Sequence, residues 1–261
     1  MGRRAVIGIL GGMGPAATVD LFDRIVRATP AETDQDHLRI LIDNNPAVPD
    51  RTAAILEGGP DPLPLLQAGV QELARRGAEL LAIPCNTAHH YLPEVQAVCP
   101  VPILDMIVET AKHICSTHGD GCIVGILATT GTVGTGLYQR ALEAENLAWM
   151  LPSDAEQEAL MDAIYGPQGI KAGAAADGPR AAIQEIGKTM AARGTEAFVL
   201  GCTEIPLVIG PGDLAKPSVA SNQVLADVAV RVALASGKPL RQLNQSLCEA
   251  VPAMLRHYGC R

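Results

Sequence analysis

Two segments of the chain recur at one constant spacing. The apolar run Val6–Leu10 matches Ile123–Leu127, and Arg76–Thr87 matches Arg193–Glu204, so that both pairs are offset by 117 positions (6 to 123, 76 to 193). Similarity between unrelated strands can produce one such match, but two matches in register and without a gap indicate a duplication. A chain with this repeat is expected to fold as two related halves.

Short apolar runs alternate with longer amphipathic ones in both halves. We expect strands at residues 5–10, 38–43, 80–84, 102–104, 122–127, 198–201 and 218–220. Helices are expected at 16–28, 63–76, 87–98, 106–117, 136–145, 155–165, 179–193 and 223–235. Such alternation is typical of parallel sheets built from βαβ units. The predicted fold class is therefore α/β: two similar three-layer α/β domains with parallel four-stranded sheets, related by a pseudo-two-fold axis.

The domain boundary is expected near residues 101–121, between the two halves of the repeat. We predict that residues 1–110 plus 216–261 form the first α/β domain, which contributes Cys85, and that residues 111–215 form the second, which contributes Cys202. Ligands of open parallel sheets bind at the carboxyl ends of the strands. The functional site is therefore predicted in the cleft between the domains.

Composition excludes several classes of partner. The formal net charge is −8 and no long basic run occurs, which disfavours nucleic acid and anionic membrane surfaces. No apolar run is long enough to span a bilayer. Seven cysteines are scattered without a CxxC pair, which argues against a disulfide framework. A reducing, cytoplasmic location is the simplest expectation.

The repeat places two cysteines at equivalent strand ends. Cys85 is followed by Asn86-Thr87 and Cys202 by Thr203-Glu204. A helix that begins there would lower the thiol pKa, and its free N–H groups can hold a carboxylate. Each half therefore offers one acid/base sulfur beside an anion site. The alternative, a small buried cysteine, is kept for the other five: Cys99, Cys115, Cys122, Cys248 and Cys260.

The loops after the first strand of each half also correspond. Gly11–Pro15 aligns with Ala128–Thr132, which includes the hydroxyls of Thr129 and Thr130. Glycine permits close backbone approach to a ligand, and threonine offers a hydrogen-bonding group. The competing interpretation is a dinucleotide loop, because Gly12-x-Gly14-x-x-Ala17 fits GxGxxA. That fingerprint alone is weak and leaves the repeat and the paired cysteines unexplained.

Two cations and one histidine are further candidates. Arg51 can bind a carboxylate bidentately, although a surface salt bridge is an equal alternative. Lys171 lies in a Gly-rich loop that could close over a ligand, but an ordinary solvated lysine is more common. His89 could pair with Cys85, although a structural histidine is the stronger interpretation. The cluster His113, Cys115, His118 and Cys122 fits no zinc spacing, so no metal is expected.

Taken together, these motifs resemble the aspartate/glutamate racemase superfamily, and most closely its aspartate racemase branch. The two cysteine motifs are characteristic of the superfamily, while the Pro-Asp-Arg-Thr segment and the Ile-Lys-x-Gly loop point to the aspartate branch. The matching stretches cover nearly the whole chain: Gly11–Pro15, Pro46–Thr52, Pro84–His89, Leu127–Thr132, Ile164–Gly173 and Leu200–Glu204.

The resemblance implies a homodimer of two-domain subunits that needs neither pyridoxal phosphate nor another cofactor, and no metal. It implies that Cys85 and Cys202 are the two acid/base groups and that Arg51 and Lys171 bind the side-chain carboxylate. The further substrate-binding residues expected are Met13, Asn86, Thr87, Thr129, Thr130 and Thr203. One stretch departs from the family, whose members commonly carry Asp followed by Ser or Thr where this chain has Ser221-Asn222.

The expected function is cofactor-independent racemisation of aspartate, with proton transfer at Cα between two cysteines. The expected partner is a small-molecule substrate, aspartate or glutamate. Three alternatives stay open at this point. The chain could racemise glutamate or another amino acid, act as a related isomerase or decarboxylase of small acids, or bind a dicarboxylate or nucleotide without catalysis.

Overall fold

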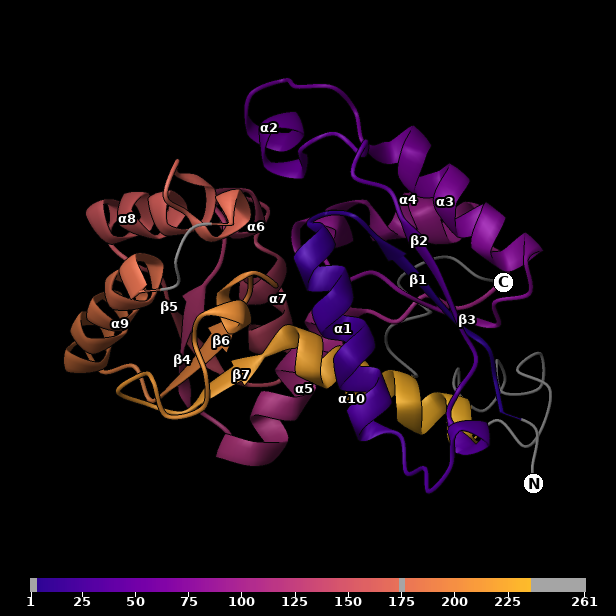
Figure 1. Cartoon of the computed structure of the whole chain (residues 1–261). Helices are drawn as coiled ribbons and strands as arrows, with labels where there is room; N and C mark the ends of the chain where they lie inside the picture. Colours follow the sequence, from indigo (N-terminus) through magenta and orange to yellow (C-terminus); the bar gives the residue numbers. More distant parts are fainter. Residues whose placement is uncertain (1–3, 174–176, 236–261) are drawn as a thin grey trace.

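The computed structural model describes residues 4–173 and 177–235, and every structural statement below concerns these residues. Two parallel sheets stand next to each other, each between layers of helices (Figure 1). The first sheet has the order β2-β1-β3, and the second has the order β5-β4-β6-β7. The strands are β1 (Ile7–Gly11), β2 (Ile40–Asn44), β3 (Leu80–Ala82), β4 (Ile123–Leu127), β5 (Ala148–Met150), β6 (Ala197–Leu200) and β7 (Ser218–Ala220).

Helices cover both faces of each sheet. On the first sheet, α1 and α10 pack on one face and α3 and α4 on the other. On the second sheet, α5, α7 and α10 share one apolar cluster, and α8 and α9 share the other. The helices are α1 (Pro15–Ala28), α2 (Arg51–Leu56), α3 (Leu63–Arg75), α4 (Leu92–Val98), α5 (Met106–His118), α6 (Thr130–Gly134), α7 (Leu137–Ala144), α8 (Asp154–Tyr165), α9 (Asp177–Ala192) and α10 (Ser221–Ala235).

The central strands show that the sequence repeat extends to the packing. Every residue of β1 is buried, as is nearly all of β4, so neither strand alternates apolar and polar residues. This is the pattern of a parallel strand covered on both faces. Gly8 and Gly125 occupy equivalent positions, where a Cβ would come within 2.4 Å of Leu81 and 2.6 Å of Phe198 respectively. Each glycine therefore makes room for a large side chain of the neighbouring strand.

The first sheet is smaller than the expected four strands. The predicted strand at 102–104 forms only an isolated bridge, Leu81 with Ile103, because Pro102 has no N–H to extend the ladder. The second sheet has its four strands, but its edge strand β5 was not expected from the sequence. The exposed Ala148 and Trp149 of β5 gave no buried-strand pattern.

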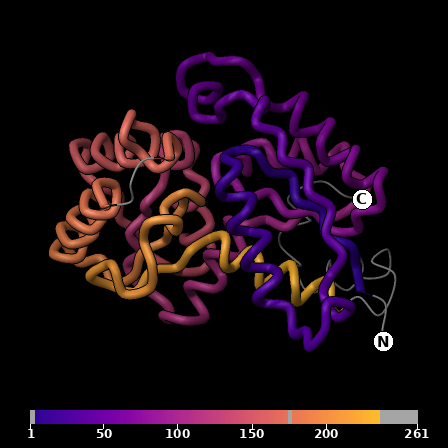
Figure 2. Tube along the Cα trace, viewed as in Figure 1, coloured from indigo at the N-terminus to yellow at the C-terminus, as the bar shows by residue number. Residues whose placement is uncertain are grey.

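The C-terminal part of the described chain joins both halves. Strand β7 lies in the segment predicted for the first domain, yet it pairs with β6 of the second sheet, which corrects that assignment for residues 218–220. Helix α10 then crosses to lie beside α1 (Figure 2). Its buried apolar residues contribute to clusters on both sheets. The remainder of the proposed domain division stays a prediction, and residues 236–261 of it lie outside the described part.

The topology brings four strand ends to one place. The loop at Gly11–Gly14 follows β1, and Cys85 follows β3 in the first half. Thr129 follows β4, and Cys202 follows β6 in the second half. None of the helices in the described ranges has the length and hydropathy that a bilayer span requires.

Candidate active site

Both cysteines of the repeat line the same cavity. Cys85 and Cys202 are each 5% exposed, and the cavity has a volume of about 10 Å³. That volume has room for about one water molecule, because larger side chains fill the rest of the space. Its lining comes from both halves of the chain: Met13, Arg51, Cys85, Asn86, Thr87, Thr129, Tyr165, Lys171, Gly201, Cys202, Thr203 and Glu204.

Threonine hydroxyls connect the two cysteine segments across the domains. Thr87 Oγ1 lies 3.1 Å from Thr129 Oγ1 and 2.8 Å from Thr132 Oγ1, so a buried hydroxyl cluster joins the first half to α6. Thr203 Oγ1 donates to the carbonyl oxygen of Pro84 at 3.2 Å, directly before Cys85. These bonds fix the backbone on which each thiol is carried.

Asn86 is oriented by groups behind the cavity. Its Oδ1 accepts a hydrogen bond from the Tyr138 hydroxyl at 2.6 Å, and its Nδ2 donates to Ser221 Oγ at 3.1 Å. Ser221 Oγ donates in turn to the Leu200 carbonyl oxygen at 3.1 Å. Complete burial raises the pKa of Tyr138 far above its usual value, which keeps its hydroxyl a donor. Ser221, at the departure from the family pattern, therefore supports Asn86 without an ionisable group.

Arg51 points inward and forms no salt bridge with any residue of 4–173 or 177–235. The side chain is 6% exposed at the start of α2, and its Nη2 donates to the Met13 carbonyl oxygen at 2.8 Å. Its Nη1 donates to the Pro49 carbonyl oxygen at 2.9 Å, while its buried Nε has no partner in the described part. Burial lowers the pKa of the guanidinium, but negative charge at Cys85 and Asp50 outweighs burial and raises it.

Lys171 also differs from a solvated lysine. Its side chain is 21% exposed, and its Nζ lies 2.8 Å from Glu204 Oε1 and 3.5 Å from the Met13 carbonyl oxygen. The ammonium group stands 5.2 Å from the centre of the Tyr165 ring, a cation–π distance. Burial opposes the charged form, but the Glu204 carboxylate more than compensates and raises the pKa of Lys171.

Glu204 is a site residue that the sequence reasoning did not select. Its Oε1 accepts from the Gly14 backbone N–H at 3.0 Å and from Lys171, and its Oε2 accepts from Cys202 Sγ at 3.1 Å and Thr203 Oγ1 at 3.3 Å. Burial raises the pKa of Cys202, and the Glu204 charge raises it further. Burial alone would raise the pKa of Glu204. The charge and hydrogen bond of Lys171 outweigh burial, and the pKa of Glu204 is lowered. The sequence feature that could have identified Glu204 is its position two residues after Cys202.

Tyr165 is the second residue that sequence reasoning missed. It lines the cavity from the end of α8, and its hydroxyl donates to Asp50 Oδ2 at 3.0 Å, at the start of α2. Burial raises the pKa of this phenol far above its usual value. No local sequence signal marks it, because its partner is 115 residues away.

Thr130 lies away from the cavity, unlike the other expected substrate-binding residues. Its backbone N–H points to Met161 Sδ at 3.3 Å, and Gln157 Nε2 reaches its hydroxyl at 3.5 Å. The first turn of α6 begins at this residue and directs it toward α8. Met13, Asn86, Thr87, Thr129 and Thr203 do line the cavity.

His89 has the contacts of a structural histidine. Its Nε2 accepts from the Met106 backbone N–H at 3.1 Å, which leaves Nδ1 to donate to the Cys85 carbonyl oxygen at 2.9 Å. Both ring nitrogens are thereby used by the backbone. This arrangement fixes the Cys85 main chain, and both hydrogen bonds of the His89 ring go to the backbone and not to the sulfur.

A nucleotide phosphate would need free backbone N–H groups in the glycine loop. In this structure the loop instead makes contacts with the protein itself. A Cβ on Gly12 would meet the Asn45 backbone at 2.3 Å, so the close approach is to the chain itself. The Gly14 N–H at the start of α1 is already bonded to the Glu204 carboxylate. The anion position of this helix therefore holds a carboxylate of the protein, which argues against the dinucleotide interpretation.

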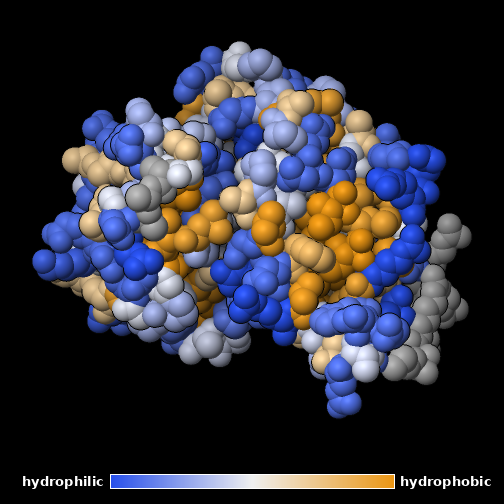
Figure 3. All heavy atoms as spheres, viewed as in Figure 1, coloured by the Kyte–Doolittle hydropathy of each residue, from blue (hydrophilic) through white to orange (hydrophobic). Residues whose placement is uncertain are grey.

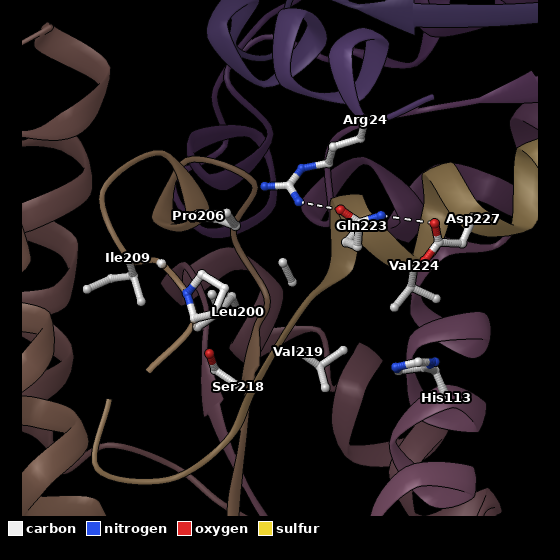
Figure 4. Close-up of a pocket in the computed structure, with 13 residues that line it drawn as sticks. Arg24, His113, Leu200, Pro206, Ile209, Ser218, Val219, Gln223, Val224 and Asp227 are labelled. Carbon is white, nitrogen blue, oxygen red and sulfur yellow. Dashed lines mark hydrogen bonds between the residues drawn. The ribbon is translucent and has the colours of Figure 1, made fainter. Parts of the chain in front are cut away.

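A larger cavity lies elsewhere, between α1, α10 and the segment after Cys202 (Figure 4). It has a volume of about 270 Å³ and contains neither cysteine of the repeat. Its polar side chains bond to one another: Arg24 Nη1 donates to Gln223 Oε1 at 2.6 Å, and Gln223 Nε2 donates to Asp227 at 2.9 Å. Over residues 4–173 and 177–235, no three His, Cys, Asp or Glu side chains are grouped as metal ligands would be.

Comparison with known proteins gives consistent matches. Residues 10–229 match the family model described as Asp/Glu/Hydantoin racemase. The solved structure of a Picrophilus torridus aspartate racemase superposes with a TM-score of 0.75 at 30% identity, covering 88% of this chain and 94% of that chain.

Two curated relatives match over shorter segments. A broad specificity amino-acid racemase of Bacillus subtilis is 29% identical over 151 residues, 53% of this chain and 60% of that protein. A glutamate racemase of Corynebacterium diphtheriae is 32% identical over 148 residues, 56% of this chain and 52% of that protein. The matched part of the chain thus spans between about half and three-fifths of these two relatives.

Proposed function

Because the chain belongs to the Asp/Glu/hydantoin racemase family, we propose that it racemises aspartate without a cofactor. Cys85 and Cys202 exchange a proton with opposite faces of the substrate Cα. The observation that carries this proposal is that the two cysteines of the repeat, 117 positions apart in sequence (85 to 202), line one buried cavity. The cavity also contains the two cations that a dicarboxylate requires.

The proposed reaction uses one thiolate and one thiol. The thiolate takes the Cα proton and becomes a thiol, while the opposed thiol gives its proton to the other face and becomes a thiolate. The electron pair left at Cα spreads into the α-carboxylate, which polar groups beside the two cysteines hold. Asn86 and Thr203, which line the cavity beside the two cysteines, are the proposed groups for this role. The two cysteines exchange roles when the opposite enantiomer reacts.

The charges in the cavity support a dicarboxylate substrate. Arg51 and Lys171 supply two positive charges at the cavity, and Lys171 is paired with Glu204. Aspartate and glutamate each carry a net charge of −1 at neutral pH. The buried Nε of Arg51 without a partner is one donor that a second carboxylate would satisfy. The similarity to an aspartate racemase structure favours aspartate, and glutamate is the second candidate.

Solvent-deuterium exchange tests the proposal. Without added cofactor, L- and D-aspartate incubated in D₂O should both gain deuterium at Cα, followed by NMR and mass spectrometry. Cys85→Ser and Cys202→Ser should each reduce racemisation by about three orders of magnitude or more, since each removes one of two required acid/base groups. Cys99→Ser, which changes a buried cysteine outside the cavity, is the control.

The outcomes separate the open alternatives. Full activity in both single cysteine variants would rule out the two-base reaction. Exchange on glutamate but not aspartate would change the substrate, and loss of CO₂ without exchange would indicate a decarboxylase. A binding protein would show a higher melting temperature with aspartate but no deuterium incorporation.

We also propose that the protein is cytoplasmic and works as a homodimer. One surface suits the contact between subunits: the α1 stripe, defined here as Val19, Phe22 and Val26, which is exposed along the outer side of α1. Hydrophobic residues gather beside α1 and the first sheet on the face shown in Figure 3. An apolar area of this kind marks an interaction surface.

A further inference from the structure

The duplication is broken at one position of the site. Glu204 stands 117 positions after Thr87 (87 to 204), so the two residues are equivalent in the repeat. Thr87 is neutral, and its hydroxyl belongs to the cluster with Thr129 and Thr132. Glu204 is a buried carboxylate whose two oxygens accept four hydrogen bonds. The two thiols therefore differ in their surroundings, although the fold around them is repeated.

The two thiols interact with charged groups of opposite sign. Cys202 Sγ donates to Glu204 Oε2 at 3.1 Å, and a carboxylate favours the neutral thiol beside it. Cys85 interacts with the buried guanidinium of Arg51. The other ionisable groups that act on Cys202 are Lys171, which favours the thiolate, and the phenols of Tyr138 and Tyr165. Of these groups, Glu204 is the acceptor bonded to the sulfur itself.

Glu204 also holds Lys171 at the edge of the cavity. Lys171 Nζ lies 2.8 Å from Glu204 Oε1, and the same oxygen accepts from Gly14 of the other half. The Glu204 carboxylate thus joins three groups that belong to different segments: the loop after β1, the loop that carries Lys171, and Cys202. A shift of Glu204 would move the lysine and change the charge at the sulfur together.

We propose that Glu204 is a positioning residue for the racemisation proposed above: it keeps Cys202 protonated, so that Cys202 begins as the proton donor, and it holds Lys171 ready for the substrate's second carboxylate. Cys85 is then the first proton acceptor. The enantiomer that presents its Cα–H to Cys85 meets Cys202 already protonated as the donor on its other face, and the opposite enantiomer needs the less stable form with Cys202 ionised. The kinetic part of this inference rests on the proposed function. The charge relation between Glu204 and Cys202 does not.

Titration of Cys202 tests the inference without any activity. In a Cys85→Ser background, thiolate absorbance near 240 nm is followed against pH, and the curve of the Cys85→Ser/Cys202→Ser protein is subtracted. Glu204→Gln should lower the midpoint of the Cys202 titration by about one pH unit or more, because a like charge beside the thiolate is removed. Lys171→Met should raise the midpoint, since it removes the opposing positive charge.

Shifts of opposite sign distinguish an electrostatic role from a loosened structure, which would move both variants in the same direction. Glu204→Asp, which keeps the charge, should restore part of the shift. Glu196→Gln is the matched control, because Glu196 caps the Ile123 N–H at an exposed position outside the cavity. An unchanged midpoint in Glu204→Gln, with the circular dichroism spectrum intact, would overturn the inference.

Kinetics then test the link to the reaction. If the protein racemises aspartate, Glu204→Gln should move the pH profile of kcat to lower pH and reduce kcat at least tenfold in one direction, and Glu204→Asp should recover part of the loss. A protein without racemase activity but with the expected titration shifts would refute the proposed function and leave the charge relation of Glu204 and Cys202 standing. Racemase activity with an unshifted pH profile of kcat in Glu204→Gln would refute only the proposed role of Glu204 and leave the proposed function standing.

Discussion

At the scale of single residues, Arg51 shows how a buried cation can be kept charged for a ligand. Three hydrogen bonds hold its guanidinium in place. The two Nη groups donate to the backbone carbonyl oxygens of Met13, Pro49 and Val48. Carbonyl oxygens orient a guanidinium but do not neutralise it. A buried charge without a full counter-ion is costly, so this arrangement favours binding of an anion.

The first prediction concerns selectivity between substrates. Arg51→Ala should lower kcat/KM for aspartate by about 10- to 100-fold, the usual worth of a charge-assisted hydrogen bond. Alanine lacks the second carboxylate, so its slower racemisation should change less than about threefold. Chiral chromatography of both reactions measures the ratio, with Arg75→Ala at the exposed end of α3 as control. Equal losses for the two substrates would show that Arg51 does not bind the second carboxylate of aspartate.

Motif and repeat marked the paired cysteines, Arg51 and Lys171 in the sequence, and the structure brings all four to one cavity, while their roles stay a prediction. The sequence did not reveal Glu204 or Tyr165, whose partners are distant along the chain: Lys171 is 33 positions from Glu204, and Asp50 is 115 positions from Tyr165. Thr130 was expected beside the substrate but does not line the cavity, because a repeat predicts strand ends better than the direction of a helix's first turn. Contacts between separate segments follow from packing, which local patterns do not encode.

At the scale of elements, α1 has two different apolar faces. Leu21 and Ile25 are buried against the first sheet, as an amphipathic helix requires, but the α1 stripe faces outward. The exposed pair Asp23 and Arg27 flanks the stripe, with Nε and Oδ2 2.7 Å apart. If a second copy packs antiparallel on this stripe, Asp23 of each copy approaches Arg27 of the other. The surface is therefore complementary to itself, as a two-fold interface must be.

The second prediction follows from this complementarity. Phe22→Asp should convert a dimer to a monomer, because it places two like charges at the centre of the apolar contact. Analytical ultracentrifugation over a range of concentrations measures the change. Val98→Asp, which alters an exposed valine at the end of α4, should leave the oligomeric state unchanged. A Phe22→Asp protein that sediments like the unsubstituted chain would place the interface elsewhere.

Elements with a strong pattern were predicted well, and edge elements were not. Buried strands such as β4 and β6 stand out as apolar runs, and their bounds shift by only one or two residues. Strand β5 escaped because an edge strand has one neighbour and exposed side chains. The segment at 102–104 was overestimated because apolar character does not report the missing N–H of Pro102.

At the scale of the whole molecule, the two halves are held over the cavity by a small set of polar bonds. Thr87 with Thr132, Thr203 with Pro84, and Glu204 with Gly14 all join segments from different halves. With about 10 Å³ of space, the cavity admits an amino acid only when side chains or domains move apart. Opening therefore breaks some of the bonds between the halves, and an exposed bond outside this buried set is expected to break first.

That bond is the one between the Tyr165 hydroxyl and Asp50 Oδ2, which joins the end of α8 to the start of α2 at 3.0 Å. Tyr165→Phe removes the hydroxyl but keeps the ring beneath the Lys171 ammonium. We expect KM for aspartate to rise about fivefold, since one hydrogen bond of about 1 kcal/mol no longer favours the closed form.

The melting temperature of Tyr165→Phe should stay within a few degrees of the unsubstituted protein, because the residue is 38% exposed and its ring is retained. Asp50→Asn tests the same bond from the other side, since an amide oxygen accepts more weakly than a carboxylate. Its effect on KM should have the same sign, and the double variant should lose little more than either alone. Additive losses would mean that Tyr165 and Asp50 act separately, and domain closure would then depend on the buried bonds instead.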